Sequence, residues 1–542
     1  MQTPFTLRSI LPWTFLLLFL YPSFSFSQIN VLDTLLEIQS ITSLPATTDR
    51  PVRLGQLPDG TLIYGTLDGQ IRSVKNGATQ LVFDANDHNL PYLSGMETKG
   101  DYIFLCGSVV QPGDTTMIGY VMKGHMPTNT WSVIAETAPY YLGLSFNDHR
   151  FSSLIVGLDT QYVYVHSGTR SNSGEVHELS NVPNTVGLRD QAIRGKLFRF
   201  PVDSSQTIQL GVDSAGVEQS GFMYAEGLRH VFALAWGTDD QLYGGSNSDR
   251  RDVAEAFYQI RQGDHYGFPW WIGGELNPLT DPNYQPSNDQ LLPGNANNQG
   301  YYDPDPNFPA IPPVSFVQPY KNIGPDADKY RDPITGAVRD ASDEDTVVTS
   351  FSGHRSPVGL LFDRDSLLPY SFTGQGFMVS YTNGSRLLQD DGHDLLQISF
   401  LGGDTISVKK LATGFRNPIS ILQDQDTLYL LDSGSSNGTG RVMYRITFAD
   451  TTSADSTSAS GQSMQEAGIS LYPNPAFDVL MIDIPETQQL SSIRIFDPIS
   501  ARIVMTADTG GPIDIQKLPS QIYLINIQMK DGQLYYGRFL KK

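Results

Sequence analysis

The sequence predicts an all-β chain that begins with a six-bladed β-propeller and ends with a smaller second domain. A turn followed by an aromatic or β-branched strand recurs along the first part at irregular but blade-sized intervals. No helical periodicity of comparable length competes with these short strands. A polar, low-complexity stretch at residues 451–461 has too little apolar content to pack, and it separates the first part from the second.

The repeated turn and strand are the basis for the predicted blade number. The copies are Pro58–Tyr64, Gly100–Phe104, Asp159–Tyr164, Asp240–Tyr243, Gly374–Val379 and Asp426–Tyr429. Six copies imply six blades. Radial repetition suits such short strands, because it leaves only short, protected sheet edges and brings the loops of one face together around the axis.

The N-terminus has the pattern of a secretory signal peptide. Arg8 precedes an apolar run from Ile10 to Tyr21, and small polar residues follow as far as Ser27. A membrane anchor is the alternative, but the run is short of the roughly 20 residues that a spanning helix needs. We therefore expect a signal peptide at 1–27, the propeller at 28–449, a linker at 450–467 and the second domain at 468–542, with no transmembrane segment after cleavage.

Composition agrees with an exported protein. The 542 residues are 39% hydrophobic and carry a formal net charge of -21. This acidic balance argues against a nucleic-acid partner, whose phosphates would be repelled; a solvated acidic surface is its simplest explanation. Cys106 is the single cysteine and cannot form an internal disulfide, so the fold depends on packing and on any bound metal.

An arginine in a hairpin entry is the first candidate for ligand binding. The apolar run Phe232–Trp236, the turn Thr238–Gln241 and the strand at Leu242 describe a β-hairpin, and Arg229 lies in the loop that enters it. The planar guanidinium there can donate to a carboxylate or quinone oxygen. Alternatively, Arg229 connects two blades through backbone carbonyls.

Three segments around this hairpin resemble one known family. The Gly227–His230 turn, the Ser246–Asp249 loop and the Tyr266–Pro269 corner are similar to motifs of the soluble glucose/sorbosone dehydrogenases. Members of that family are six-bladed β-propellers that hold pyrroloquinoline quinone (PQQ) and calcium. The resemblance covers most of the chain between about Val52 and Ile446. It implies oxidation of an aldose or related sugar to its lactone, in which Arg229 stabilises developing charge and grips the quinone.

His149 is the candidate catalytic base. It lies in a loop before the strand Leu154–Gly157, and an imidazole takes up a proton near working pH. The resemblance implies that it accepts the proton of the sugar's anomeric hydroxyl. Thr169 stands where the family has the carboxylate that orients this histidine; it could hydrogen-bond the ring but could not stabilise an imidazolium by charge. We expect a slower reaction unless Asp148 or Glu175 substitutes. Otherwise His149 is simply a hydrogen-bonded loop histidine.

The resemblance also implies that Arg229, His230 and Arg416 contact PQQ. His230 replaces the family's Asn, and its larger ring would reshape the pocket. The segment Gly414–Pro418 resembles the loop that opens the last blade, which would bring Arg416 toward the axis opposite Arg229. Two arginines facing one cavity would suit a tricarboxylate quinone. The alternative for Arg416 is a strut between blades.

Calcium ligands are expected in the polar loop after the hairpin. Ser246, Asn247 and Asp249 are the candidates, because hard cations take carboxylate and carbonyl oxygens. Further aspartates lie in a long polar insertion between Trp271 and Ser350, which we expect to form an ordered lid or substrate loop over one face. None of these segments has the spacing of a dedicated calcium loop.

The last part of the chain resembles the C-terminal sorting domain of the type IX secretion system, a small C-terminal β-sandwich. The resemblance rests on Leu471–Ala476, which reads Leu-Tyr-Pro-Asn-Pro-Ala, and on strands expected at Val479–Ile484, Ile493–Phe496 and Leu518–Ile527. It implies export by the type IX secretion machinery through the periplasm and outer membrane, which leaves the protein secreted or at the cell surface.

Together these observations favour a secreted, PQQ-dependent sugar dehydrogenase. The main alternative is a non-catalytic cell-surface propeller that binds a glycan or a protein, and the departures at Thr169 and His230 favour it. A calcium-dependent lactonase is a third possibility and would need clustered acidic ligands on the axis. A dehydrogenase requires His149, Arg229 and Arg416 to converge on a planar slot, whereas scattered side chains favour the binding protein.

Overall fold

The structure is a computed structural model of the 542-residue chain. It describes residues 29–46, 49–113, 115–143, 148–176, 187–294, 298–344, 346–382, 388–390, 392–449, 461–463, 469–473, 476–485, 489–496, 503–509, 511–530 and 534–542. The expected signal peptide at 1–27 lies outside these residues, as does most of the expected linker.

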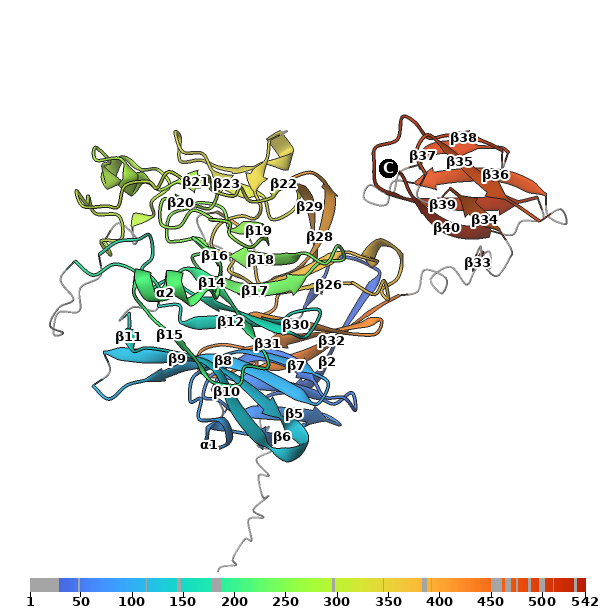
Figure 1. The fold of residues 1–542 in the computed structure, drawn as a ribbon. Helices are drawn as coiled ribbons and strands as arrows, with labels where there is room; N and C mark the ends of the chain where they lie inside the picture. Colours follow the sequence, from blue (N-terminus) through green and yellow to red (C-terminus); the bar gives the residue numbers. More distant parts are fainter. Residues whose placement is uncertain are drawn as a thin grey trace, which may run out of the picture.

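Antiparallel sheets built from consecutive strands make up the first part of the chain (Figure 1). The first three sheets contain β3 (Pro51–Gln56), β4 (Leu62–Thr66), β5 (Ile71–Lys75) and β6 (Ala78–Phe83); β7 (Leu93–Lys99), β8 (Tyr102–Val110), β9 (Thr116–His125) and β10 (Thr130–Thr137), extended by β11 (Tyr140–Tyr141) and β15 (Ile208–Leu210); and β12 (Phe151–Val156), β13 (Tyr162–Ser167), β14 (Lys196–Pro201) and β16 (Met223–Glu226).

Three more sheets follow along the chain. They contain β17 (Val231–Trp236), β18 (Leu242–Ser246) and β19 (Ala256–Ile260); β26 (Pro357–Phe362), β27 (Gly376–Ser380), β28 (Asp394–Gly402) and β29 (Thr405–Thr413), extended by β1 (Asn30–Val31), β22 (Lys321–Pro325) and β25 (Val348–Thr349); and β30 (Pro418–Asp424), β31 (Thr427–Asp432), β32 (Val442–Phe448) and β2 (Leu36–Ser43).

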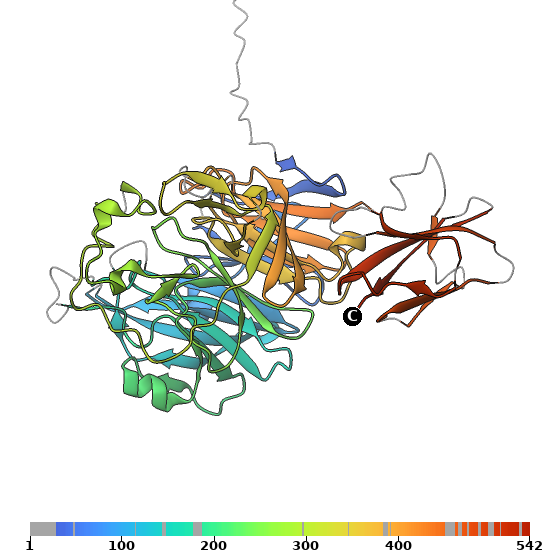
Figure 2. The same cartoon turned by 90° about the horizontal axis from the view of Figure 1, so that it is seen from above.

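The sheets close into a ring. The first strand of each sheet lies against the first strand of the next, in the order β3, β7, β12, β17, β26, β30 and back to β3. The N-terminal strand β2 pairs antiparallel with β32, so both ends of this region meet in the last sheet. This arrangement is a β-propeller, and the all-β class predicted from the sequence is confirmed (Figure 1, Figure 2).

Each copy of the predicted repeat lies at the turn into the second strand of a different sheet, which is β4, β8, β13, β18, β27 or β31. In or beside each copy, one residue adopts a positive φ: Gly60, Gly100, Thr160, Asp240, Gly374 and Gln425. Tight hairpin turns need this left-handed conformation because it matches the twist of the strands that they join. The repeat is therefore visible in the sequence as turn chemistry.

Apolar side chains from neighbouring sheets form the core between the blades. Cys106 on β8 is among them; it packs in one cluster with Phe104 and Val121, and burial raises the pKa of its thiol to about 12. A thiol this buried and this weakly acidic is a packing residue with little reactivity.

Short helical turns lie in connections between strands: α1 (Ala85–His88), α2 (Ser214–Ser220), η1 (Met126–Thr128) and η5 (Tyr370–Phe372).

The long insertion before β26 is ordered over its described residues. It contains β20 (Trp271–Ile272), β21 (Glu275–Leu276), β23 (Lys329–Arg331), β24 (Val338–Asp340), η2 (Pro278–Thr280), η3 (Pro286–Asn288) and η4 (Ser342–Glu344). Leu279, Leu292 and Tyr302 form a small core of its own. The Asn277 amide donates to the Ser173 and Pro269 carbonyls at 2.7 and 2.8 Å, which fixes the insertion against loops of the propeller.

The C-terminal strands form two sheets of their own (red in Figure 1). They are β33 (Gly461–Ser463), β34 (Ser470–Tyr472), β35 (Val479–Asp483), β36 (Leu490–Phe496), β37 (Ile503–Ala507), β38 (Ile513–Asp514), β39 (Ile522–Met529) and β40 (Leu534–Leu540). Alternate apolar residues such as Ile493, Ile495 and Phe539 are buried in one cluster, as in a β-sandwich.

Two boundaries in this region differ from the predicted ones. The strand expected from Leu518 begins at Ile522, because residues before it form a turn. The expected linker contains β33, which pairs in parallel with β40 and so belongs to the C-terminal sheets. Asn474 and Pro475 of the sorting motif lie outside the described residues. Within the described chain, no helix is long and apolar enough to cross a membrane.

Candidate functional site

Polar side chains meet at the propeller face where the first strands begin. His149 precedes β12, and Arg229 and His230 precede β17; Asn172 follows β13 and Asn247 follows β18. Because loops of one propeller face converge around the axis, residues from the third and fourth sheets come together there. We call these five residues the cradle.

Arg229 is the centre of the cradle. Its side chain is buried, and its Nε donates to the Asn172 carbonyl at 2.8 Å while Nη1 donates to the Asn247 carbonyl at 3.2 Å. The guanidinium therefore ties the third sheet to the fourth, which is the structural role left open by the sequence. It forms no ion pair with any described residue. Burial lowers its pKa, and the more distant Asp249 and Glu255 oppose that effect.

His149 stacks on His230, with ring centroids 3.7 Å apart and an angle of 9° between the planes. Its backbone N–H donates to the Thr169 carbonyl at 2.8 Å. Gly168 allows this approach, because a Cβ there would lie 2.4 Å from the His149 Cβ. Burial holds the pKa of His149 well below its usual value, and the charges of His230 and Arg229 lower it further. The His149 imidazole is therefore neutral near pH 7.

No acid orients the His149 ring in the part of the chain described, and the expected substitutes are engaged elsewhere. The Thr169 hydroxyl donates to the Ser171 carbonyl at 3.1 Å and not to the His149 ring. Asp148 pairs with Arg194 at 2.7 Å. Glu175 accepts from the backbone N–H groups of Asn172 and Ser173 at 2.8 and 2.7 Å. A buried arginine thus occupies the Asp148 carboxylate, and backbone N–H groups occupy the Glu175 carboxylate.

Three buried polar atoms of the cradle find no hydrogen-bond partner among the described residues. They are Asn172 Nδ2, His230 Nδ1 and Asn247 Oδ1. Each such atom costs about 1–3 kcal/mol if it stays unpaired. A polar ligand beside Arg229 would offer partners to all three, and carboxylate or quinone oxygens would complement the unpaired guanidinium. The donor chemistry of the cradle thus suits PQQ, with Arg229 and His230 as the residues that would hold it, but the cavity that Arg229 lines has a volume of about 10 Å³, so the surrounding loops would have to move apart to admit a quinone.

Some oxygens of the expected calcium ligands accept internal hydrogen bonds. Asn247 gives its carbonyl to Arg229, and the buried Asp249 carboxylate accepts from the Tyr302 hydroxyl and from the Arg251 backbone N–H at 2.7 Å. No group of three or more His, Cys, Asp or Glu residues is placed to hold a metal in the described ranges. Internal donors thus occupy the Asp249 carboxylate and the Asn247 carbonyl, whereas Asn247 Oδ1 has no partner among the described residues, and the calcium assignment of Ser246, Asn247 and Asp249 stays a prediction.

Replacing Asp249 with asparagine is expected to stabilise the protein at high pH. Burial raises the pKa of Asp249 to about 7, outweighing Arg229 and the Arg251 N–H. The pKa of Asp249 in the folded protein exceeds the unfolded value of about 3.9. The protonated carboxyl therefore contributes stability that is fully present below about pH 4 and is lost as the pH rises to about 7. We expect the variant to gain roughly 2–4 kcal/mol at pH 8 and little near pH 4 in thermal unfolding.

Asp203→Asn is the matched control, because the Asp203 side chain is 87% exposed. It should show no such dependence on pH. A calcium-binding Asp249 would give the opposite result, since Asp249→Asn would then be less stable than the wild type at pH 8 in calcium-containing buffer.

Arg416 does not join the cradle through any contact in the described chain. Its Nη1 donates to the Ser435 hydroxyl at 3.1 Å, and its backbone N–H donates to Asp432 at 2.7 Å. Its side chain also packs on Gly440, where a Cβ would lie 2.4 Å from the arginine Cδ. Arg416 is thus held by the loops of the last sheet. The structure brings His149, Arg229 and His230 together, and the expected convergence with Arg416 is not found.

A cavity of about 270 Å³ flanks the cradle and was not foreseen from the sequence. Thr169, Gly227 and Trp270 are among its lining residues. Lys196 and Glu226 form an ion pair of 2.8 Å in the lining. The indole N–H of Trp270 donates to the Pro309 carbonyl at 2.8 Å, which fixes the ring in the wall. An aromatic wall with charged neighbours is suited to a polar ring.

Comparisons with known proteins identify the C-terminal region. Residues 470–540 match the family model of the secretion system C-terminal sorting domain. No curated protein matches the chain. Among solved structures, the chain is similar to a putative oxidoreductase (glucose dehydrogenase) from Thermus thermophilus, with 15% identity, a TM-score of 0.43 and coverage of 76% of this chain and 99% of that one.

Two further solved structures are similar over the same share of the chain. The soluble aldose sugar dehydrogenase of Escherichia coli in its apo form has 13% identity and a TM-score of 0.47, covering 76% of this chain and 99% of that one. The PQQ-bound aldose sugar dehydrogenase of Streptomyces coelicolor has 14% identity and a TM-score of 0.42, covering 76% and 98%. Likenesses this loose carry no argument; the fold rests on the sheets described above.

Proposed function

We propose that the propeller is a quinone-dependent sugar oxidoreductase with the cradle as its quinone site. One observation carries this proposal: a buried guanidinium without an ion-pair partner among the described residues stands beside three unpaired polar atoms and two stacked imidazoles. The oxygens of a planar anion would accept from the guanidinium and from Asn172 Nδ2, whereas Asn247 Oδ1 needs a donor group on the ligand. The motifs that resemble the glucose/sorbosone dehydrogenases fall on the same residues.

The chain's own residues define what each would do in the reaction. A bound PQQ supplies a two-electron acceptor for the hydride of the sugar carbon. His149 is neutral near pH 7 and can accept the hydroxyl proton on a ring nitrogen. No described carboxylate stabilises the resulting imidazolium, so we expect slow turnover. Arg229 would grip the anionic groups of the quinone, and the flanking cavity at Trp270 would receive the sugar.

Dye reduction by the PQQ-loaded full chain with a panel of aldoses tests this proposal. We expect His149→Ala to lower the rate by about 100-fold or more, because general base catalysis contributes about 10²–10⁴-fold. His125→Ala is the control, because His125 ends β9 and bonds to Thr128. Loss of the rate in both variants, or in neither, would contradict the assignment of His149.

The C-terminal domain gives this proposal its location. Its match to a secretion system sorting domain supports export by type IX secretion, to the cell surface or the medium. A sugar-oxidising propeller there would meet its substrate outside the cell. The partners that we propose are therefore a sugar and the secretion machinery.

A non-catalytic recognition propeller is the second candidate. The cavity that Arg229 itself lines has a volume of about 10 Å³, room for about one water molecule. Together with the missing carboxylate behind His149, this observation favours a protein that binds a glycan or another protein through its loops. Failure of the full chain to bind PQQ would select this candidate. A lactonase is not favoured, because the described residues contain no acidic cluster on the axis.

A further inference from the structure

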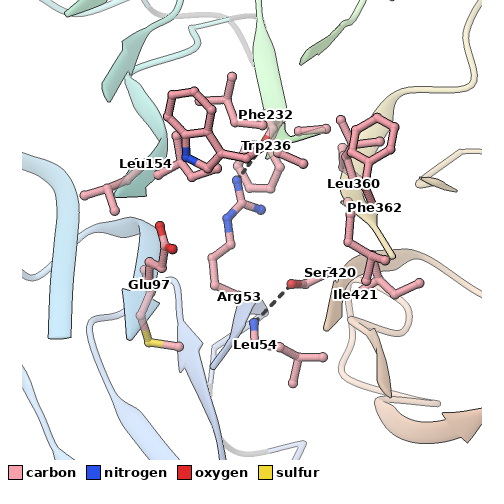
Figure 3. Close-up of a pocket in the computed structure, with 18 of the residues that line it drawn as sticks. Arg53, Leu54, Glu97, Leu154, Phe232, Trp236, Leu360, Phe362, Ser420 and Ile421 are labelled. Carbon is pink, nitrogen blue, oxygen red and sulfur yellow. Dashed lines mark hydrogen bonds between the residues drawn. The ribbon is translucent and has the colours of Figure 1, made fainter. Parts of the chain in front are cut away.

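A second cavity lies on the propeller axis, toward the end where the first strands finish. It has a volume of about 300 Å³. All six first strands contribute to its wall, including Glu97 from β7, Trp236 from β17 and Leu360 from β26 (Figure 3). The cradle precedes β12 and β17, so it lies toward the opposite end of the same strands. The two sites are separate.

Arg53 forms the inner end of this cavity. Its side chain is 8% exposed. Its guanidinium donates to the carbonyls of Val52, Ser152 and Phe232 at 3.2, 3.3 and 2.6 Å. It also lies 3.5 Å from the centre of the Phe232 ring (Figure 3). These partners are neutral, and within the described ranges Arg53 forms no ion pair.

Arg53 keeps its charge at neutral pH, and no described carboxylate forms an ion pair with it. Burial lowers its pKa to about 9, which still leaves a cation at pH 7. Burial also raises the pKa of Glu97 to about 7, so that this wall residue is only partly ionised; the Val156 N–H and Lys99 oppose the shift. Arg364 at the wall is already paired with Asp240. A buried cation without a counter-ion is costly, and an anion entering the cavity would relieve that cost.

Apart from Lys99 and Ser420, the rest of the wall is apolar. Leu154, Trp236 and Leu360 face the cavity around Arg53 (Figure 3). The Trp236 indole N–H is used by the Val156 carbonyl at 2.8 Å, which leaves the ring as an apolar surface. A ligand that suits this cavity therefore has one anionic group and an apolar body. A volume of about 300 Å³ is at the small end of the range for small-molecule sites.

We propose that the axial cavity binds a small monocarboxylic acid, whose carboxylate pairs with Arg53 and whose apolar body packs against Leu154, Trp236 and Leu360. Nη2 of Arg53 already donates to two carbonyls, so the carboxylate would accept from the Nε–H or from the remaining Nη1 hydrogen. This site is independent of the quinone site proposed above. It can be present whether or not the propeller is an enzyme.

Calorimetric titration of the full chain with octanoate and with octan-1-ol tests the proposal. The two probes share an apolar chain and differ in charge. We expect octanoate to bind at least about tenfold more tightly, since a hydrogen bond to a charged group contributes about 1.5–3 kcal/mol. Octanoate should also change the fluorescence of Trp236, and Trp236→Phe should remove that change.

Leu360→Trp fills the cavity without changing its charge, and it should weaken octanoate binding by about tenfold or more, because the added ring takes the ligand's place. Leu367→Trp is the matched control, because Leu367 is 43% exposed and lies outside the cavity. Arg53→Met should remove the preference for octanoate over octan-1-ol. If Arg53→Met does not fold, the Leu360 pair still decides the question.

Three results would overturn the proposal. They are no octanoate binding at millimolar concentration, equal affinity for the acid and the alcohol, or octanoate binding that Leu360→Trp leaves unchanged. Arg53 would then be a strut between the first, third and fourth sheets, whose carbonyls it joins.

Discussion

Replacing Arg355 with methionine is expected to lower the free energy of unfolding by about 3–5 kcal/mol, because removing one partner of a buried ion pair leaves its charges uncompensated. Arg355 is 1% exposed and bonds to the carboxylates of Asp390 and Asp394, which are buried as well. Without it, these carboxylates would face only Lys410, whose Nζ lies 3.7 Å from Asp390 and 3.9 Å from Asp394. The fifth sheet would lose the charge balance at its inner end.

Urea unfolding of the full chain at pH 7 measures this effect, and its pH dependence gives a second check. Burial would raise the pKa of Asp390, but Arg355 and Lys410 outweigh it and hold the pKa below its usual value. Because the pKa of Asp390 is lower in the folded than in the unfolded protein, its ionised carboxylate contributes stability above the unfolded pKa of about 3.9. That stability is lost as the pH falls through the pKa of the folded protein. The difference between wild type and variant should therefore narrow below about pH 4.

Arg364→Met is the matched control for this measurement. Arg364 pairs with Asp240, but their side chains are 33% and 69% exposed. An exposed ion pair contributes about 0–1 kcal/mol, so this variant should unfold close to the wild type. Equal unfolding free energies for the two variants would contradict the role given to Arg355.

Arg229→Met is expected to weaken PQQ binding by about 100-fold or more. Two charge-assisted hydrogen bonds of about 1.5 kcal/mol each amount to about 3 kcal/mol, which is a factor of about 100 in Kd. Equilibrium dialysis with PQQ measures the change. Thermal unfolding of the same variant is needed beside it, because Arg229 also joins the loops of the third and fourth sheets through Asn172 and Asn247.

Arg416→Met distinguishes this account from the one that the sequence resemblance implies. Arg416 is bound to Ser435 in the last sheet and makes no described contact with the cradle. We therefore expect its loss to change the Kd of PQQ by less than about threefold, which is well under the effect of losing one charge-assisted hydrogen bond. An effect as large as that of Arg229→Met would show that both arginines hold the quinone.

The fold could be predicted because its signal is local. Tight turns require residues in the left-handed conformation, such as Gly60, Thr160 and Asp240, and a strand of the same kind follows each of these turns. The expected linker was less predictable. β33 pairs with β40, and a strand so far along the chain leaves no trace in the local composition.

The site was only partly predictable for a related reason. His149, Arg229 and His230 directly precede first strands, so knowing the propeller is enough to place them on one face. The hydrogen bond to the Asp249 carboxylate could not be foreseen, because its donor, Tyr302, lies far away in the sequence. The axial cavity was not predicted, although Arg53 within the buried strand Pro51–Gln56 could have indicated it.

The most direct test of the quinone site is equilibrium dialysis of PQQ against the full chain in the presence of EDTA. The account predicts one PQQ bound per chain at micromolar concentration, and an affinity that added calcium does not change, since the cradle supplies Arg229 and unpaired polar atoms but, within the described chain, no acidic cluster to hold a cation. Absence of binding with and without calcium would contradict the quinone site and leave the propeller as a recognition module. Binding that appears only when calcium is added would contradict the cradle as described here.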